Sequence, residues 1–222
     1  MDETKNNGIY MNKRGRHTKL FTKNLVPGKK VYGEKLFKTE GTEYREWDPS
    51  RSKLSAGILK NIPQLSLGSG DAVLYLGASS GTTVSHISDI VGRSGIVFAI
   101  DFAPRVVRDL VFVAETRKNI APILGDCFHP DTYEDRICHC DFLFQDIAQK
   151  NQVGIFLKNM KFIGQGCQAV LSLKSRSIDV TRKPKGIYNE VLQALEKEVE
   201  VVDWKTLDPY EEDHALFLCK KR

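Results

Sequence analysis

The chain of 222 residues is 41% hydrophobic and 27% charged, and its 33 Lys and Arg against 28 Asp and Glu give a net charge of +5. This balance suits one globular domain of ordinary core size with a short extension and excludes a wholly disordered chain. No apolar stretch approaches the roughly 20 residues that cross a bilayer, and the polar start MDETKNNG lacks the apolar core of a secretory signal. We therefore expect an intracellular protein without membrane contact.

The five cysteines are an odd number, and several adjoin hydrophobic runs, where a thiol behaves as a small apolar side chain. This pattern favours a reducing compartment. Cys138 and Cys140, together with His129, could suggest a metal site, but a Cys-x-Cys pair lacks the usual zinc spacing. The sequence therefore predicts no metal.

Basic residues dominate between Lys5 and Lys38 although the net charge of the chain is small. A phosphate-rich partner is one interpretation, because lysines that neutralise phosphates release condensed counterions. A solvated basic face is the other interpretation, and the charge pattern alone leaves both open.

Residues 8–47 mix short β-prone pieces with turn formers at Pro27, Gly28 and Gly33, and no helical period is present. The pieces GIYMN, TKLFTKNLV, KKVYGEKLF and EYREW predict a few short antiparallel strands. We place the domain boundary at Asp48–Ser50, which divides the chain into a small β-rich domain of residues 1–50 and a second domain of residues 51–222.

The second domain is predicted to begin with a helix over residues 51–62 that stops at Pro63. Strands then alternate with helices, which indicates βα units and a largely parallel, doubly wound sheet. The predicted strands are 72–78, 95–102, 120–126, 140–147 and 166–175, and the helices between them are 82–91, 104–116 and 152–162. After a helix over 186–197, strands 199–207 and 215–219 are joined without room for a crossover helix, so they should pair antiparallel.

The first strand of this domain ends in a loop, Gly77–Gly81, that leads into a helix starting with Thr82 and Thr83. Glycines allow a ligand to approach the backbone closely, and a helix N-terminus offers unpaired N–H groups. The Gly-x-x-x-Gly spacing departs from the dinucleotide fingerprint, which weakens a pyrophosphate interpretation. By itself, the loop is equally compatible with a tight turn that binds nothing.

Carboxylates stand where the next three strands end, at Asp101, Asp126 and Asp146. Asp101 follows the glycine loop by roughly 20 residues, the position from which a doubly wound fold reaches ribose hydroxyls. Each aspartate alone is more often a cap or turn residue. Three of them along one carboxyl edge predict a nucleoside pocket.

Several stretches of the chain match a known family: YLGASSGTTVSHISDIVG, the RDL of Arg108–Leu110, His129-Pro130, FQDIAQKNQ and LKSRSIDVT. They resemble fibrillarin, the methyltransferase of box C/D guide ribonucleoproteins, and its archaeal form in particular. The likeness covers nearly the whole chain, with Asp101 where the family often has Glu and Cys127 where it often has Ala. No Gly-Arg-rich extension precedes Gly8, so the archaeal type and a cytoplasmic location are expected.

The resemblance implies an S-adenosylmethionine-dependent RNA 2′-O-methyltransferase that modifies pre-rRNA and tRNA. It implies an α/β, Rossmann-like methyltransferase domain with a seven-stranded sheet whose last strand is antiparallel. It also implies three partners, namely a Nop-domain scaffold protein, a kink-turn-binding protein related to a ribosomal protein, and a box C/D guide RNA paired with its target.

The resemblance further implies which residues surround the cofactor. Thr82 and Thr83 would lie near the methionine end, Asp101 on the ribose, Phe102 beside the adenine, and Asp126 with Cys127 at the base edge. Asp146 and Gln149 would lie near the sulfonium. The complete set is Gly77, Ala78, Thr82, Thr83, Asp101, Phe102, Asp126, Cys127, Asp146, Ile147, Ala148 and Gln149.

The family carries a catalytic Lys-Asp-Lys set that looks like Lys53, Asp146 and Lys174. As a hypothesis, Lys174 orients or deprotonates the 2′-hydroxyl, Asp146 holds that lysine and offsets the sulfonium charge, and Lys53 stabilises the developing alkoxide. His214 is the candidate for a fourth position, which a related bacterial family fills with Glu.

Two other features carry less weight. The basic run Arg176, Arg182, Lys183 and Lys185 would face RNA, with a merely solvated loop as the alternative. His86 is expected to be structural.

Two other functions compete with methyl transfer: a nicotinamide-dependent oxidoreductase, disfavoured by the glycine spacing, and a catalytically idle RNA-binding scaffold, disfavoured by the complete Lys-Asp-Lys set.

Overall fold

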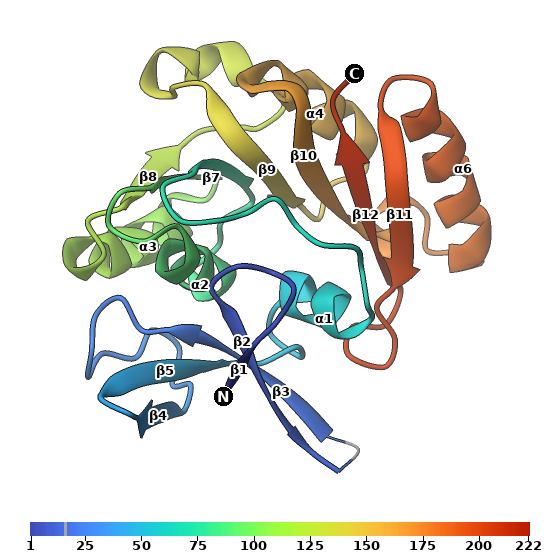
Figure 1. The fold of residues 1–222 in the computed structure, drawn as a ribbon. Coiled ribbons are helices and arrows are strands. Elements are labelled where there is room, and N and C mark those ends of the chain that lie inside the picture. Colours follow the sequence, from blue (N-terminus) through green and yellow to red (C-terminus); the bar gives the residue numbers. More distant parts are fainter. Residues whose placement is uncertain (16) are drawn as a thin grey trace.

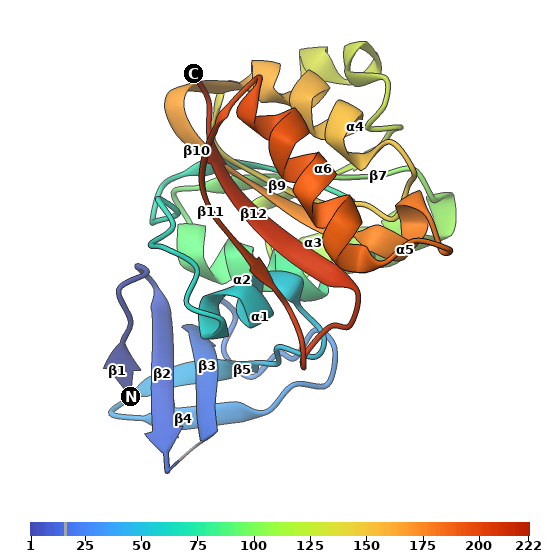
Figure 2. The same ribbon diagram turned by 90° about the vertical axis from the view of Figure 1, so that its right-hand side faces the viewer.

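The computed structural model describes residues 1–15 and 17–222, which form two β-sheets with helices between and around them. Figures 1 and 2 show the small N-terminal sheet beneath two helices, α1 and α2, that also cover one face of the large sheet. In the described residues, no helix combines the length and the apolar character needed to cross a membrane.

The N-terminal sheet is antiparallel and has the strand order β1-β2-β3-β5-β4. Its strands are β1 (Asp2–Glu3), β2 (Ile9–Arg14), β3 (His17–Lys23), β4 (Leu36–Thr39) and β5 (Thr42–Trp47). The strands expected in GIYMN, TKLFTKNLV and EYREW are present, whereas the two-residue strand β1 was not expected.

The strand expected over KKVYGEKLF is wrong for most of its length, because only Leu36 and Phe37 lie in a strand. The carboxylate of Glu34 accepts hydrogen bonds from the backbone N–H groups of Val31 and Tyr32 and from Arg45. These bonds fold residues 31–34 into a loop, because they satisfy backbone donors that a strand would have turned toward a neighbour.

The large sheet has the order β11-β12-β10-β9-β6-β7-β8, and five of its strands run parallel. The last strand, β12, is inserted between β10 and β11 and is antiparallel to both, as expected. The strands are β6 (Ala72–Leu76), β7 (Ile96–Asp101), β8 (Ile120–Leu124), β9 (Cys140–Asp146), β10 (Ile163–Lys174), β11 (Glu200–Thr206) and β12 (His214–Lys220).

Helices cover both faces of this sheet, and each face has its own apolar core. The helices α1 (Lys53–Leu59), α2 (Thr82–Val91) and α3 (Pro104–Thr116) cover one face. The other face is covered by α4 (Gln152–Asn159), α5 (Ser175–Ile178) and α6 (Pro184–Glu196). Short 3-10 turns at Pro130–Thr132, Glu134–Arg136 and Met160–Phe162 complete the helical elements. The bounds predicted for α2 and α3 are confirmed, whereas α5 was not expected.

A buried carboxylate, Asp89 on α2, joins the two sheets. Its two oxygens pair with Arg45 of β5 at 2.7 Å and with Arg117, which ends α3, at 2.6 Å, and all three side chains are buried. The hydroxyl of Thr22 and the backbone N–H of Leu25 also donate to it. A carboxylate without water needs such partners, so Asp89 holds the N-terminal sheet against the large domain.

His86 lies one turn before Asp89 and is also buried, as expected for a structural histidine. Its ring stacks on Trp47 with the ring centroids 4.9 Å apart, and its two nitrogens hydrogen-bond the hydroxyls of Thr22 and Tyr32. Burial, together with the positive charges of Arg45 and Arg117, holds the pKa of His86 well below its ordinary value. The imidazole is therefore neutral in the folded protein.

This neutral histidine predicts that acid weakens the fold. Below about pH 6.5 the unfolded chain binds a proton that the folded chain cannot, so the free energy of unfolding should fall by up to about 1.4 kcal/mol per pH unit. Urea denaturation between pH 8 and pH 5 measures this slope. The variant His86→Gln should be less stable but should show a shallower slope, and the exposed His139→Gln serves as its control. An unchanged slope in His86→Gln would contradict this interpretation.

Candidate active site

The four predicted catalytic residues come from four elements that begin or end at the same edge of the large sheet. In the strand register, Lys174 of β10 lies opposite His214 of β12, and Ser172, two residues before Lys174, lies opposite Asp146 of β9. Side chains at paired and alternate positions share a face of the sheet. Asp146, Lys174 and His214 therefore lie on the face that α1 covers, and α1 begins with Lys53.

Lys53 reaches the end of β9 because α1 and α2 begin side by side. Ser52 caps α1, and its hydroxyl accepts a hydrogen bond from Thr83 near the start of α2 at 3.0 Å. From this position Nζ of Lys53 pairs with Oδ2 of Asp146 at 3.1 Å, with both side chains about one fifth exposed. In the described residues the ion pair of Asp146 is with Lys53, whereas the hypothesis assigned Asp146 to Lys174.

The backbone of Lys174 is held by a residue that sequence reasoning missed, the fully buried Gln152. The side-chain oxygen of Gln152 accepts from the N–H of Lys174 at 2.9 Å, and its amide nitrogen donates to the Lys174 carbonyl at 3.0 Å. Its position at the start of α4, six residues after Asp146, was the available signal. These two hydrogen bonds to the backbone fix the end of β10 and leave the Lys174 side chain available to contact a ligand.

His214 is almost buried and lies within the electrostatic influence of the Lys53–Asp146 pair. Burial lowers its pKa, the hydrogen bond to the Glu212 carbonyl opposes this, and Lys53 lowers the pKa further. Nδ1 lies 2.7 Å from that carbonyl and so carries the proton that it donates. The ring is neutral, and Nε2 remains as a hydrogen-bond acceptor.

A cavity of about 130 Å³ lies beside these residues at the ends of β6, β7 and β9. Eight of the twelve predicted cofactor residues line it: Gly77, Asp101, Phe102, Cys127, Asp146, Ile147, Ala148 and Gln149. Ala78, Thr82, Thr83 and Asp126 lie outside its lining, with Thr83 bonded to Ser52 and Asp126 bonded to the N–H of Phe128.

Gly77 brings the β6 loop into contact with the end of β9. Its φ is +81°, and an added Cβ would lie 2.2 Å from the carbonyl oxygen of Asp146. Any other residue would be strained at this φ and would push the two strand ends apart. This close approach forms one wall of the cavity.

Asp101 and Ser79 form another wall, and Ser79 was not predicted. The backbone N–H of Ser79 donates to Oδ2 of Asp101 at 2.9 Å, and the N–H of Ala103 donates to Oδ1 at 3.0 Å. These bonds orient the carboxylate and leave one lone pair on each oxygen for a ligand hydroxyl. Phe102, 64% exposed, and the buried Cys127 add apolar surface. Burial raises the pKa of Cys127 to about 12, so it remains a neutral thiol.

The remaining predicted features lie outside this cavity. The five cysteines are free, and the described residues contain no cluster of His, Cys, Asp or Glu suited to a metal ion. Within the basic run, Arg176 pairs with Asp213 and Arg182 pairs with Glu190. Part of this positive charge is therefore balanced within the chain.

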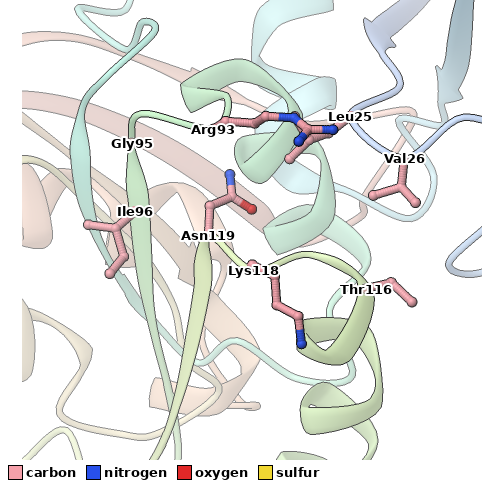
Figure 3. Close-up of a pocket in the computed structure, with 8 residues that line it drawn as sticks. All are labelled: Leu25, Val26, Arg93, Gly95, Ile96, Thr116, Lys118 and Asn119. Carbon is pink, nitrogen blue, oxygen red and sulfur yellow. The ribbon is translucent and has the colours of Figure 1, made fainter.

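A larger cavity, about 310 Å³, opens at the opposite edge of the sheet, between the N-terminal sheet and the start of β7. Figure 3 shows Arg93 reaching across it toward Leu25, with Lys118 and Asn119 on the other side. The described residues that line it include none of the predicted site residues. The predicted residues converge on the smaller cavity instead.

Comparison with known proteins gives the family of the chain. A family model described as Fibrillarin matches residues 1–222. The chain belongs to the fibrillarin family. It is 51% identical, over 91% of this chain and 90% of the relative, to the fibrillarin-like rRNA/tRNA 2′-O-methyltransferase of Thermococcus onnurineus (strain NA1).

Two solved structures share both fold and sequence with this fibrillarin-family chain. Aeropyrum pernix fibrillarin, crystallised with natively bound S-adenosyl-L-methionine, is 43% identical with a TM-score of 0.87, covering 96% of this chain and 94% of its own. A fibrillarin/Nop5p complex contains a chain that is 36% identical, also with a TM-score of 0.87, and the match covers 98% and 99%.

The close contact at Gly77 predicts that adding one methyl group, in Gly77→Ala, lowers the stability of this protein. Gly77→Ala should destabilise the protein by more than Gly28→Ala, which has nearly the same φ of +80° but no heavy atom within 4 Å of an added Cβ. The shared φ strain is about 1–2 kcal/mol, and the excess in Gly77→Ala reports the clash with Asp146. Urea denaturation of both variants measures the difference. Equal losses would mean that the loop moves aside freely.

Proposed function

We propose that this chain transfers a methyl group from S-adenosylmethionine to ribose 2′-hydroxyl groups of rRNA and tRNA, directed by a box C/D guide RNA. The observation that carries this proposal is the convergence of the Lys53–Asp146 pair, Lys174 and His214 beside a cavity at the carboxyl edge of the sheet. Membership of the fibrillarin family and the name of the 51% identical relative support it.

The cavity fits a nucleoside that carries a positive charge. It combines two carboxylates, Asp101 and Asp146, with apolar surface from Phe102 and Ile147. Such a lining suits ribose hydroxyls, an adenine ring and a sulfonium better than a phosphate. A volume of about 130 Å³ takes only part of so large a ligand, and the rest would lie along the exposed edge toward Thr82. Bound there, S-adenosylmethionine supplies a methyl group already activated by the sulfonium charge.

The side chains around Asp146 would then manage the hydroxyl proton. Lys174 contacts the 2′-hydroxyl and either orients this hydroxyl or accepts its proton. Lys53, held by Asp146, stabilises the negative charge that develops on the oxygen. His214 is neutral with Nε2 unprotonated, so it can accept a hydrogen bond from the same hydroxyl or from Lys174. Positioning supplies most of the rate, since aligned reactants can gain about 7–11 kcal/mol.

Guided methylation needs a higher affinity for RNA than this chain offers by itself. A net charge of only +5, in a chain whose Arg176 and Arg182 already pair with acidic residues, should give weak and salt-sensitive RNA affinity. We therefore include three partners in the proposal: a Nop-domain scaffold protein, a kink-turn-binding protein of the ribosomal type, and the guide RNA with its target. The related fibrillarin crystallised with Nop5p supports the first of these.

Replacing Asp101 by Ala should weaken S-adenosylmethionine binding by about 1.5–3 kcal/mol, because a charged acceptor for the ribose hydroxyls is lost. Calorimetric titration of the full chain measures this affinity. Asp109→Ala, an exposed carboxylate on α3, is the control and should bind as the unaltered chain does. Unchanged affinity in Asp101→Ala would remove Asp101 from the site.

The complete particle provides the test of catalysis. Methylation of a target RNA should be negligible for the chain alone and should appear when all three partners are added.

In that particle, Lys174→Ala should lower the single-turnover rate at least about a hundredfold while cofactor affinity stays within about twofold. Lys118→Ala, at the opposite edge, should behave normally. A parallel loss of cofactor binding in Lys174→Ala would mean that this lysine shapes the pocket.

A further inference from the structure

A third cavity, of about 320 Å³, lies between α6 and β11 and has no part in the site described above. Its lining combines two aromatic rings with a cation, a hydroxyl and two carboxylates: Tyr188, Trp204, Lys185, Thr206, Asp208 and Asp213. Figures 1 and 2 show α6 along β11, the edge strand of the large sheet.

This cavity adjoins the turn that leads into β12. Asp213 immediately precedes His214, and its carbonyl accepts hydrogen bonds from both the backbone N–H and the hydroxyl of Ser175, the residue after Lys174. The catalytic side chains lie on the α1 face of the sheet, and the cavity lies on the α6 face at the same edge. The turn that precedes β12 therefore borders both the catalytic edge and the cavity.

Trp204 lines the cavity and is partly exposed. Its ring stacks on Phe217, the residue opposite it in β12, with centroids 5.5 Å apart and planes 13° apart. Tyr188 of α6 approaches the indole only at a tilt of 56°, with its centroid 6.0 Å away, so it does not stack on the indole. A flat ring entering from outside would continue the stack that Phe217 begins.

The charges of the lining decide between a phosphate and a base. Lys185 and Arg176, which pairs with Asp213, balance the charges of Asp208 and Asp213, so the lining has no excess of positive charge to attract an anionic group. One oxygen of Asp213 accepts from Arg176 at 2.8 Å, which leaves the other available. Among the described residues, Lys60 donates to the backbone carbonyl of Asp208 and not to its carboxylate. Free carboxylate oxygens beside an aromatic face suit a neutral base that donates N–H groups.

We propose that this cavity binds an unpaired nucleobase of the RNA substrate, stacked on Trp204 and donating amino hydrogens to Asp208 and Asp213. Adenine, cytosine and guanine carry an exocyclic amine with two donor hydrogens, whereas the donor of the uracil pairing edge, N3–H, lies between two carbonyl oxygens that the carboxylates repel. The cavity therefore disfavours uracil. This inference rests on the proposed function, because it takes RNA as the substrate whose nucleotides pass this edge.

Tryptophan fluorescence of the full chain tests the proposal directly. The chain has two tryptophans, and Trp47 is wholly buried, so a base that stacks from solvent can quench only Trp204. Single-stranded hexamers of adenylate, cytidylate and uridylate are the probes. We expect quenching by the first two at about tenfold lower concentration than by the uridylate hexamer.

Three variants separate the contributions. Asp208→Ala should reduce the preference over uridylate to less than about threefold. Trp204→Phe removes the responsive fluorophore and should leave only the unquenched emission of Trp47, which assigns the quenching to Trp204. Lys197→Ala, at the far end of α6, is the matched surface control and should behave as the unaltered chain does. Because Asp208 is exposed and its hydrogen bond from Lys60 is to the backbone carbonyl, Asp208→Ala keeps the test valid even if Trp204→Phe folds poorly.

S-adenosylmethionine titration of the same variants keeps the two proposals distinct. Asp208→Ala should bind the cofactor within about twofold of the unaltered chain, so a chain that binds no cofactor at all would contradict the proposed function and not this cavity. No quenching by any hexamer, or equal quenching by all three, would overturn the base site. Quenching by a Nop-domain protein without RNA would also overturn it, because the cavity would then be a protein contact.

Discussion

The buried carboxylate of Asp89 is the interaction on which the arrangement of the whole chain depends. It compensates Arg45 from the N-terminal sheet and Arg117 from the end of α3, and neither guanidinium has access to water. Removing one partner of a buried pair leaves an uncompensated charge and costs about 3–5 kcal/mol. Because Asp89 lies on α2, the N-terminal sheet also sets the position of the helix whose first turn follows the Gly77–Gly81 loop.

The active-site edge depends on a second constraint, the antiparallel insertion of β12 between β10 and β11. The insertion places His214 opposite Lys174, and the hydrogen bonds from Ser175 to Asp213 secure the turn that precedes it. A parallel strand in this position would have brought the other end of the segment to the edge. The same turn carries Asp208 and Asp213, so one topological feature places the proposed catalytic residues and the proposed base cavity at the same edge.

Local patterns were sufficient where one physical rule acts without competition. The bounds of α2 and α3 follow from apolar periodicity and from Gly92 and Pro104 at their ends. They were insufficient where a distant charge decides the backbone. Residues 31–34 have strand-like composition, yet Glu34 binds their N–H groups because Arg45 already holds its carboxylate. The role of Gln152 was missed for a similar reason, since its partner Lys174 is 22 residues away along the chain.

The sequence by itself determined the family, the parallel order of the βα units and the strand ends at which carboxylates stand, because these depend on residue type and on spacing along the chain. Only the tertiary structure decided which charges meet. It pairs Asp146 with Lys53, bonds Ser79 to Asp101 and brings Trp204 and Asp208 into the lining of one cavity. Such contacts depend on strand register and helix packing, which join segments that are far apart in the chain, and sequence spacing carries no record of those distances.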